Sequence, residues 1–226
     1  MLTKVALIGR PVAESLSPRM QNAAFAALGL DWTYLAFDVA EPVAAVQALR
    51  TLGFAGANVT IPHKRAAAAL CDEADGPAVN TLVFEPGGRI RGVNTDREIV
   101  AGIASTRVCL IGAGGAAEAL RPGLRGEVRQ FSRRGEWPPD ASGCDLIVNA
   151  TPVVDDLLVV PHAGQVVVEL AYAGGAETAL VRAARAAGCE VVDGLEGLVR
   201  QGARSFEIWT GVPAPVDVMR EAVRSA

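Results

Sequence analysis

The sequence has few of the residues that build metal centres, disulfide frameworks or membrane spans. Its four cysteines are far apart, with no Cys-X-X-Cys pair, and there are only two histidines. No zinc-binding spacing is present, so no metal site is expected. No stretch approaches the roughly 18 consecutive apolar residues of a membrane-spanning helix. The cysteines are therefore expected to be reduced, mostly buried thiols of a cytoplasmic protein.

The overall charge also disfavours some partners. The 226 residues carry a formal net charge of −4, and half of them are hydrophobic. Mild acidity disfavours nucleic acids and anionic membranes as partners. The length suits one large or two small domains, with enough apolar residues for a core that needs no metal or disulfide. The apolar run in "MLTKVALIGR" is too short for a signal peptide.

Short runs rich in Val, Ile and Leu alternate with Ala-rich helical stretches, which is typical of a mostly parallel α/β sheet. In the first half, Ser17 is predicted to cap a helix with Pro18 in its first turn, and Pro62 to begin another helix. "VNTLVF" and "RIRGV" predict a β-hairpin across "EPGG". The further elements expected here are strands at 4–8, 32–39 and 55–60 and helices at 17–29, 41–52 and 94–105.

The second half repeats the alternation. Strands are expected at 107–111, 127–132, 145–150, 165–171 and 189–193. The C-terminal part is expected to be helical, with a break near 210–215. The pattern predicts two α/β lobes with a boundary near Thr106.

A glycine-rich turn joins a strand to a helix in the second lobe. Gly112, Gly114 and Ala117 form a GxGxxA pattern directly after the strand "RVCLI". Glycines at these positions allow a tight turn and let backbone N–H groups approach a pyrophosphate. The pattern favours a dinucleotide site, with a plain strand-to-helix turn as the alternative.

The end of the following strand indicates which dinucleotide would bind. An NAD site places an acidic residue there to hold the ribose 2′-hydroxyl. Ser132, Arg133 and Arg134 stand there instead. Because a guanidinium forms strong charge-assisted hydrogen bonds with phosphate, these residues favour NADP. The alternative is that both arginines are simply solvated.

Polar residues also follow the strands of the first lobe. Ser15 and Ser17 lie beside a helix start, where two hydroxyls and the positive helix end suit a carboxylate. The alternative is that Ser17 only caps its helix and Ser15 belongs to a turn. Asn58 and Thr60 follow in "NVTIPHK", at the end of a strand where open α/β sheets bind ligands.

Lys64 and Asp96 are candidates for proton transfer. Lys64 is expected in the first turn of a helix, where the helix dipole opposes a positive charge and so suits proton transfer. An ordinary solvated lysine is the alternative. "VNT" and "VNTD" add Asn80 and Asp96. A carboxylate facing Lys64 would hold its ammonium, although Asp96 could equally be a helix N-cap.

Taken together and in this order, the motifs resemble those of the shikimate dehydrogenase family over nearly the whole chain. They are "GRPVAESLSPRMQNAAF", "GANVTIPHK", "AVNTL", "GVNTD", "GAGGAA", "DLIVNATP" and "VVDGLEGLVRQGARSFEIWTG". The resemblance implies NADP-linked reduction of 3-dehydroshikimate to shikimate, in the biosynthesis of chorismate and aromatic amino acids. It also implies a substrate-binding α/β domain (1–105, completed by C-terminal helices at 195–226) and a Rossmann-like NADP domain (106–194). The protein would be a monomer or a homodimer.

The resemblance also assigns roles to individual residues. Ser15 and Ser17 would bind the substrate carboxylate, and Lys64 and Asp96 would form the catalytic pair. The other residues expected to bind the substrate are Asn58, Thr60, Asn80, Tyr172 and Gln201. Those expected to bind NADP are Gly112, Ala113, Gly114, Gly115, Ala116, Ser132, Arg133, Arg134, Asn149 and Thr151.

The chain departs from the family pattern on the nicotinamide side. Arg97 stands where a glycine usually follows "NTD", Gly197 replaces a common methionine, and "VVDD" follows "NATP" in place of Gly-Met. Two alternatives therefore stay open. One is a quinate or aminoshikimate dehydrogenase of the same superfamily, and the other is a shikimate-binding homologue that has lost hydride transfer.

Overall fold

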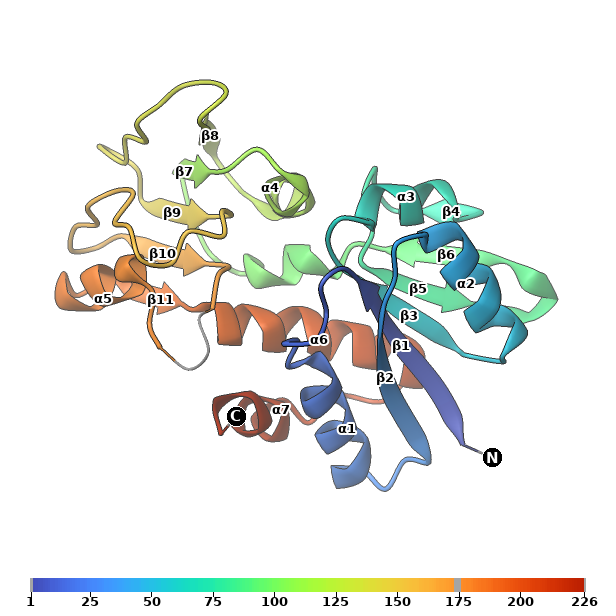
Figure 1. Cartoon of the computed structure of the whole chain (residues 1–226). Helices are drawn as coiled ribbons and strands as arrows, with labels where there is room; N and C mark the ends of the chain where they lie inside the picture. The colour runs from blue at the N-terminus through green and yellow to red at the C-terminus, as the bar shows by residue number, and fades with distance from the viewer. Residues whose placement is uncertain (1, 173–175, 226) are drawn as a thin grey trace. The chain divides into compact units, whose positions relative to one another are not determined.

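The computed structural model describes residues 2–172 and 176–225. The chain forms two compact units (Figure 1). Unit 1 comprises Met1–Thr95 and Val199–Ala226, and unit 2 comprises Asp96–Leu198. Each unit contains one β-sheet, which confirms an α/β fold. Within the described residues, we find no helix with the length and apolar character needed to cross a bilayer.

The sheet of unit 1 has six strands in the order β2-β1-β3-β5-β6-β4. β1 is parallel to β2 and β3, whereas β5 and β6 form the predicted antiparallel hairpin, with Thr81 opposite Val93. The strands are β1 (Thr3–Gly9), β2 (Trp32–Asp38), β3 (Gly56–Val59), β4 (Glu73–Ala74), β5 (Thr81–Phe84) and β6 (Ile90–Val93). The helices are α1 (Ser17–Ala27), α2 (Pro42–Thr51), α3 (Lys64–Ala69), the part of α6 (Gly194–Thr210) from Val199 onward, and α7 (Val216–Arg224).

The core of unit 1 explains its apolar runs. β1 lies between β2 and β3 and buries side chains on both faces: Val5 on one face and Ala6 and Ile8 on the other are 0% exposed. Val46 and Leu49 of α2 pack into the same cluster. These contacts hold the carboxyl ends of β1 and β3 in place, next to the candidate site residues.

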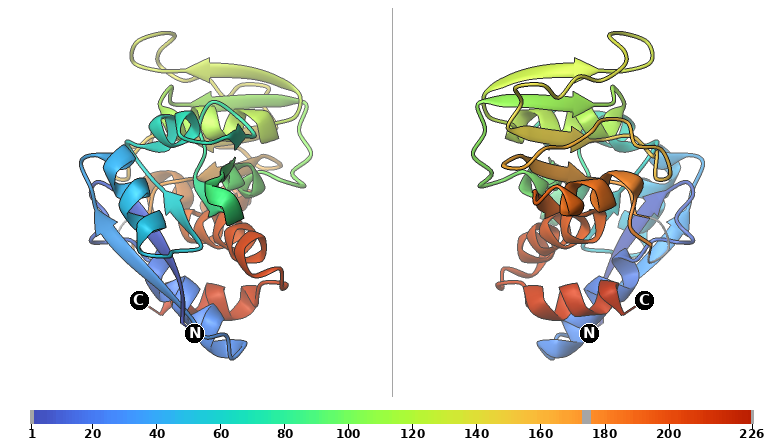
Figure 2. Two further views of the ribbon diagram at one scale, coloured as in Figure 1. Left: turned by 90° about the vertical axis from the view of Figure 1, so that its right-hand side faces the viewer. Right: turned by 90° about the vertical axis from the view of Figure 1, so that its left-hand side faces the viewer.

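The sheet of unit 2 is fully parallel, in the order β11-β10-β9-β7-β8. In the right-hand view of Figure 2, the strands β8, β7, β9 and β10 lie side by side. Val108 and Leu110 of β7 enter one apolar cluster while Cys109 and Ile111 enter another, as alternation along a central strand requires. The strands of unit 2 are β7 (Arg107–Ile111), β8 (Glu127–Phe131), β9 (Leu146–Asn149), β10 (Val166–Glu169) and β11 (Glu190–Val192), and its α-helices include α4 (Gly115–Leu120) and α5 (Ala179–Ala186).

The α-helix predicted over 94–105 is wrong. Only a short 3₁₀ segment, η2 (Thr95–Ile99), forms there. Its start is anchored by Asp75 Oδ1, which accepts from Asn94 N at 2.7 Å. Gly102 then adopts φ +78, which ends the right-handed helical path. Because Asp96 lies inside η2, the prediction that it could be a helix N-cap is also wrong.

Two predicted helix starts shift by one or two residues. Ser17 is the first residue of α1 rather than its N-cap, which is Leu16 without a side-chain cap. Pro62 does not begin α3, because a turn closed by His63 N donating to Thr60 O at 3.0 Å precedes the helix. Lys64 is the first residue of α3, so its predicted place in the first turn is confirmed.

The cysteines are all free. Cys109 and Cys144 are buried, and Cys71 and Cys189 are partly exposed. Burial raises the pKa of the Cys109 thiol to about 12, so this side chain behaves as an apolar core residue.

Candidate functional site

A cluster of buried polar side chains lies in the middle of the sheet of unit 1, where the carboxyl end of β3 meets the start of β5. Its members come from β3, the start of β5, the start of η2 and helix α6, and each is less than 9% exposed. They are Asn58, Asn80, Thr81, Thr95 and Ser205. Buried polar groups require hydrogen-bond partners, and here the members satisfy one another. We refer to these residues as the amide–hydroxyl cluster.

Asn58 is held on every side by protein groups. Tyr34 Oη donates to its Oδ1 at 2.8 Å. Its Nδ2 lies 3.0 Å from Asn80 O, a carbonyl that can only accept, so the orientation of the carboxamide is defined. The same nitrogen lies 3.0 Å from Thr81 Oγ1 and from Ser205 Oγ. Asn58 therefore connects β3 to β2, β5 and α6 through hydrogen bonds.

Asn80 presents its amide nitrogen to Gln201. Its Oδ1 accepts from Thr95 N at 2.7 Å and from Thr95 Oγ1 at 3.1 Å, so this oxygen is used within the cluster. Its Nδ2 donates to Gln201 Oε1 at 3.4 Å. A ligand hydroxyl could accept from the nitrogen of Asn80 and donate to the oxygen of Gln201. The fold thus brings two predicted substrate-binding residues together from distant parts of the sequence.

Ser15 and Ser17 lie at the start of α1. Ser15 is part of a turn, in which its N donates to Val12 O at 3.1 Å, and its Oγ accepts from Ser17 N at 3.3 Å. Ser17 is 7% exposed, and its side chain hydrogen-bonds to Tyr34. Burial raises the pKa of Tyr34 far above its ordinary value, with the bond to Ser17 partly opposing the shift. Tyr34 therefore stays a neutral hydroxyl that links Ser17 to Asn58.

Thr60 and Lys64 follow β3. Thr60 N donates to Ile8 O at 2.9 Å, and its methyl group faces Gly9, where an added Cβ would lie 2.2 Å away. Lys64 is half-buried, and its carbonyl accepts from Val79 N at 3.1 Å. The backbone of Lys64 is thus bonded to the residue that precedes Asn80.

Asp96, Arg97, Tyr172 and Gly197 belong to unit 2. Asp96 is 8% exposed and follows Thr95, whose amide is held by Asn80. The partly exposed Arg97 lies 3.9 Å from Glu98 Oε1. Tyr172, after β10, is 39% exposed. A Cβ at Gly197 would lie 3.4 Å from Ile99 Cγ2, so part of the space that a side chain would take is filled by Ile99.

A cavity of about 450 Å³ opens at the carboxyl ends of the strands of unit 2. Many of the residues predicted to bind the cofactor line it. These are Gly112, Ala113, Gly114, Ser132, Arg133, Arg134 and Thr151. Gly115 and Ala116 begin α4, and Asn149 is buried at the end of β9. In parallel α/β sheets, ligands bind at this end of the strands.

The glycine turn leaves room for a ligand close to the backbone. Gly112 has φ +119, and a Cβ there would lie 3.0 Å from Ala150 O. The turn is fixed by Gly112 N, which donates to Phe131 O at 2.8 Å, and by Gln130 Nε2, which donates to Gly112 O at 2.8 Å. No atom lies within 4 Å of a Cβ built at Gly114. This open turn fits the close approach of a pyrophosphate to the backbone.

The two glycines predict different mutant behaviour. Gly112→Ala combines a positive φ with a close contact to Ala150 O, so we expect a loss of stability of about 1–3 kcal/mol. Gly114→Ala fits an extended backbone in open space, so its unfolding midpoint should stay near that of the wild type while its affinity for NADP⁺ falls. Chemical unfolding and calorimetry measure the two effects. Equal stability losses in both variants would contradict this assignment.

Two arginines form one wall of this cavity. Arg133 and Arg134 are exposed, and the Arg133 guanidinium lies 5.9 Å from the centre of the Trp137 ring. Trp137 also lines the cavity, although the sequence pattern did not indicate it. A cation over an aromatic face is attracted to the ring, so Trp137 helps to orient Arg133. A phosphate in the cavity would meet this guanidinium.

A buried carboxylate lies behind the cavity. Asn149 Oδ1 accepts from Thr151 N at 3.0 Å and from Thr151 Oγ1 at 2.7 Å. Its Nδ2 donates to both Glu169 oxygens at 3.0 Å. Glu169 is 0% exposed and also accepts from Ala171 N and Thr178 Oγ1. This network fixes Thr151 in the cavity wall, and sequence analysis did not predict Glu169 as part of it.

The buried Glu169 predicts a pH dependence of stability. Burial disfavours its charged form and raises its pKa above the ordinary value. Folded chains therefore hold this proton more tightly than unfolded chains. The stabilisation is present below the unfolded pKa of about 4.3 and is lost as pH rises through the folded pKa. In urea titrations, the wild type should lose stability relative to Glu169→Gln as pH rises above about 4.3. A difference in the free energy of unfolding between the two proteins that does not change with pH would contradict the prediction.

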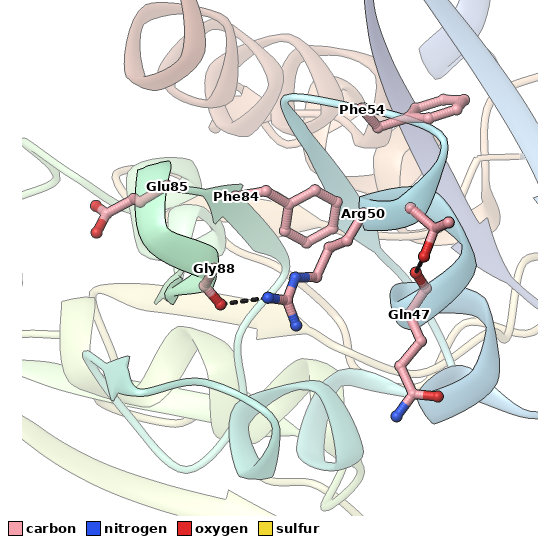
Figure 3. Close-up of a pocket in the computed structure, with 7 residues that line it drawn as sticks. Gln47, Arg50, Phe54, Phe84, Glu85 and Gly88 are labelled. Carbon is pink, nitrogen blue, oxygen red and sulfur yellow. Dashed lines mark hydrogen bonds between the residues drawn. The ribbon is translucent and has the colours of Figure 1, made fainter.

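A second hollow, of about 540 Å³, lies in unit 1 beside α2 and contains none of the predicted site residues (Figure 3). Arg50 reaches across it and donates to Gly88 O, while Glu85 points away and lies 3.0 Å from Arg91 Nε. Both charged side chains are thus engaged with protein partners. We assign no ligand to this hollow.

The chain is similar to known proteins over most of its length. Residues 7–82 match the shikimate dehydrogenase substrate binding domain, and residues 194–224 match the shikimate 5'-dehydrogenase C-terminal domain. A protein of Rubrobacter xylanophilus named shikimate dehydrogenase (NADP(+)) is 40% identical, with 97% of this chain and 94% of the relative covered.

The chain is also similar to solved structures of dehydrogenases that act on shikimate or quinate. Shikimate 5-dehydrogenase of Thermus thermophilus, in complex with NADP(H) and shikimate, is 32% identical with a TM-score of 0.85 and covers 99% of both chains. Quinate dehydrogenase of Corynebacterium glutamicum, in complex with NAD, is 26% identical with a TM-score of 0.85 and also covers 99% of both chains. The chain belongs to the shikimate dehydrogenase family.

Proposed function

We propose that this chain catalyses the reversible, NADP-dependent reduction of 3-dehydroshikimate to shikimate. The observation that carries the proposal is the 40% identity, over 97% of the chain, to a relative named shikimate dehydrogenase (NADP(+)). The quinate dehydrogenase is less similar, at 26% identity. The two arginines on the wall of the unit 2 cavity add independent support for NADP.

The residues of unit 2 that fit NADP surround one cavity. The glycine turn at Gly112 and Gly114 would take the pyrophosphate, and Ser132, Arg133 and Arg134 the 2′-phosphate of the adenosine ribose. Gly115 and Ala116 would supply further backbone N–H groups at the start of α4. When bound, NADPH supplies the hydride.

The residues that fit the substrate lie mostly in unit 1. Ser15 and Ser17 would bind its carboxylate, with Tyr172 as a further partner. Thr60 and the facing amides of Asn80 and Gln201 would bind its hydroxyls. Asn58 is engaged by Tyr34 and by the other members of the amide–hydroxyl cluster, so its contribution is to hold Asn80 and its neighbours in place.

Lys64 is proposed as the group that donates a proton to the developing alkoxide, with Asp96 as the carboxylate that supports it. A positioned acid–base group of this kind accelerates proton transfer by roughly 10²–10⁴-fold. Lys64 has a defined backbone position at the start of α3, which suits this role.

Initial rates with a panel of substrates test the proposal. Shikimate and quinate are each offered with NADP⁺ and with NAD⁺, and the ratios of kcat/KM are compared. We expect shikimate with NADP⁺ to give the highest value. A higher value for quinate would identify the chain as a quinate dehydrogenase, and shikimate binding without any turnover would identify a non-catalytic binding protein.

A further inference from the structure

Ser205 is a buried hydroxyl at the centre of the amide–hydroxyl cluster. It lies on α6, one turn after Gln201, and is 0% exposed. Its Oγ lies 3.0 Å from Asn58 Nδ2, 2.9 Å from Thr81 Oγ1 and 3.2 Å from Thr95 Oγ1. It thus bonds α6 to β3, β5 and η2.

The single proton of Ser205 has a defined acceptor. Ser205 Oγ donates to Gln201 O at 3.1 Å. Its oxygen is then left to accept from Asn58 Nδ2 and Thr81 Oγ1. The hydroxyl therefore connects the backbone carbonyl of Gln201 to side chains of two strands. Those strands also position Asn80, whose carbonyl accepts from Asn58 Nδ2.

Other contacts hold α6 in place without Ser205. Val199 and Phe206 are 0% exposed, and Trp209 Nε1 donates to Leu82 O at 3.0 Å. Gln21 Nε2 donates to Gly202 O at 2.9 Å. Removing one hydroxyl should therefore leave the helix docked and change mainly its rotation near Gln201.

We propose that Ser205 is a positioning residue for substrate binding. By joining α6 to Asn58 and Thr81, it sets the rotation of the helix so that Gln201 Oε1 faces Asn80 Nδ2. A substrate hydroxyl then meets a donor from one side and an acceptor from the other. This inference rests on the proposed function, since Gln201 and Asn80 bind the substrate only under that proposal.

Kinetics of Ser205→Ala test the inference. We expect the KM for shikimate to rise roughly 10-fold, as the loss of a buried hydrogen bond predicts, with the KM for NADP⁺ unchanged. Thr210→Ala is the matched control, because Thr210 Oγ1 also donates to the carbonyl four residues earlier on α6, at 2.8 Å, but lies outside the cluster. Its KM for shikimate should equal that of the wild type.

A double-mutant cycle separates positioning from a general structural role. In a Gln201→Ala background, Ser205→Ala should have little further effect on the KM for shikimate, because both substitutions remove the same interaction. A full additional effect would overturn the inference. Thr81→Val, which removes a partner of Ser205 at nearly constant volume, should raise the same KM and serves if Ser205→Ala does not fold.

The outcomes also distinguish this inference from the proposed function. If the wild type oxidises shikimate and both Ser205→Ala and Thr81→Val have the wild-type KM for shikimate, the inference is wrong but the proposed function stands. A wild-type chain that neither oxidises nor binds shikimate would overturn the proposed function and this inference with it. Equal rises in the KM values for shikimate and NADP⁺ would indicate a general structural defect and also overturn the inference.

Discussion

Lys64→Ala should lower kcat for shikimate oxidation by roughly 10²–10⁴-fold, while the affinity for shikimate changes much less. The reason is that an alanine cannot exchange a proton with the substrate oxygen, whereas the serines and amides proposed to bind the substrate remain. Steady-state kinetics give kcat, and calorimetry with shikimate gives the affinity. The half-buried Lys64 begins α3, and its carbonyl is bonded to Val79 N, so truncating the side chain leaves the backbone supported.

Two controls make the Lys64 result specific. Arg65→Ala removes an adjacent, exposed cation and should leave kcat near the wild-type value. Lys64→Arg keeps the charge but replaces an exchangeable ammonium with a guanidinium that does not lose its proton, so it should be as impaired as Lys64→Ala. Turnover that survives in Lys64→Ala would remove this residue from the chemistry.

Arg133→Ala should raise the KM for NADPH by roughly 10–100-fold, the effect expected for losing a hydrogen bond to a charged group. The KM for NADH should change little, because NADH lacks the 2′-phosphate. Arg133 lines the unit 2 cavity and lies over Trp137, so its guanidinium is oriented in the free protein. Initial rates of 3-dehydroshikimate reduction with each cofactor give the ratio of the two KM values.

Arg125→Ala is the matched control for cofactor choice. Arg125 is an exposed arginine of the same unit that does not line the cavity. Its substitution should leave both KM values unchanged. If Arg133→Ala raised the KM values for NADPH and NADH equally, the arginine would not be reading the 2′-phosphate.

The strands could be predicted because burial shapes their composition. β1 and β7 are central strands with side chains buried on both faces, and they appear in the sequence as continuous apolar runs. The β5–β6 hairpin was equally visible, because a Pro-Gly-Gly segment separates two β-rich runs. In both cases a short stretch of sequence is enough to predict the strands.

The region after β6 could not be predicted in the same way. Residues 94–105 have the composition of a helix, but Gly102 adopts φ +78, which ends the right-handed helical path. The start of the segment is anchored by Asp75 and Asn80, which accept from the backbone N–H groups of Asn94 and Thr95. These partners are distant in sequence, and a local pattern does not reveal them. The resulting short 3₁₀ turn places Asp96 directly after a residue anchored in the amide–hydroxyl cluster.

The site residues that were predicted belong to local sequence motifs, whereas those that were missed act through contacts between distant parts of the sequence. The glycine turn and the arginines are contiguous motifs, and they line one cavity. The sequence analysis missed Tyr34, Glu169 and Ser205. They hold predicted site residues through hydrogen bonds from other elements: Tyr34 and Ser205 bond to Asn58, and Glu169 bonds to Asn149. Only Ser205 had a local signal, because it lies four residues after Gln201 and so on the same face of a helix.

Product analysis is the most direct test of NADPH-dependent shikimate formation by this chain. Purified protein is mixed with 3-dehydroshikimate and NADPH, and the products are separated and identified by chromatography. We expect shikimate and NADP⁺ to accumulate in equal amounts, and far more slowly when NADH replaces NADPH. If folded protein leaves 3-dehydroshikimate unchanged in the presence of NADPH, the proposed function is wrong.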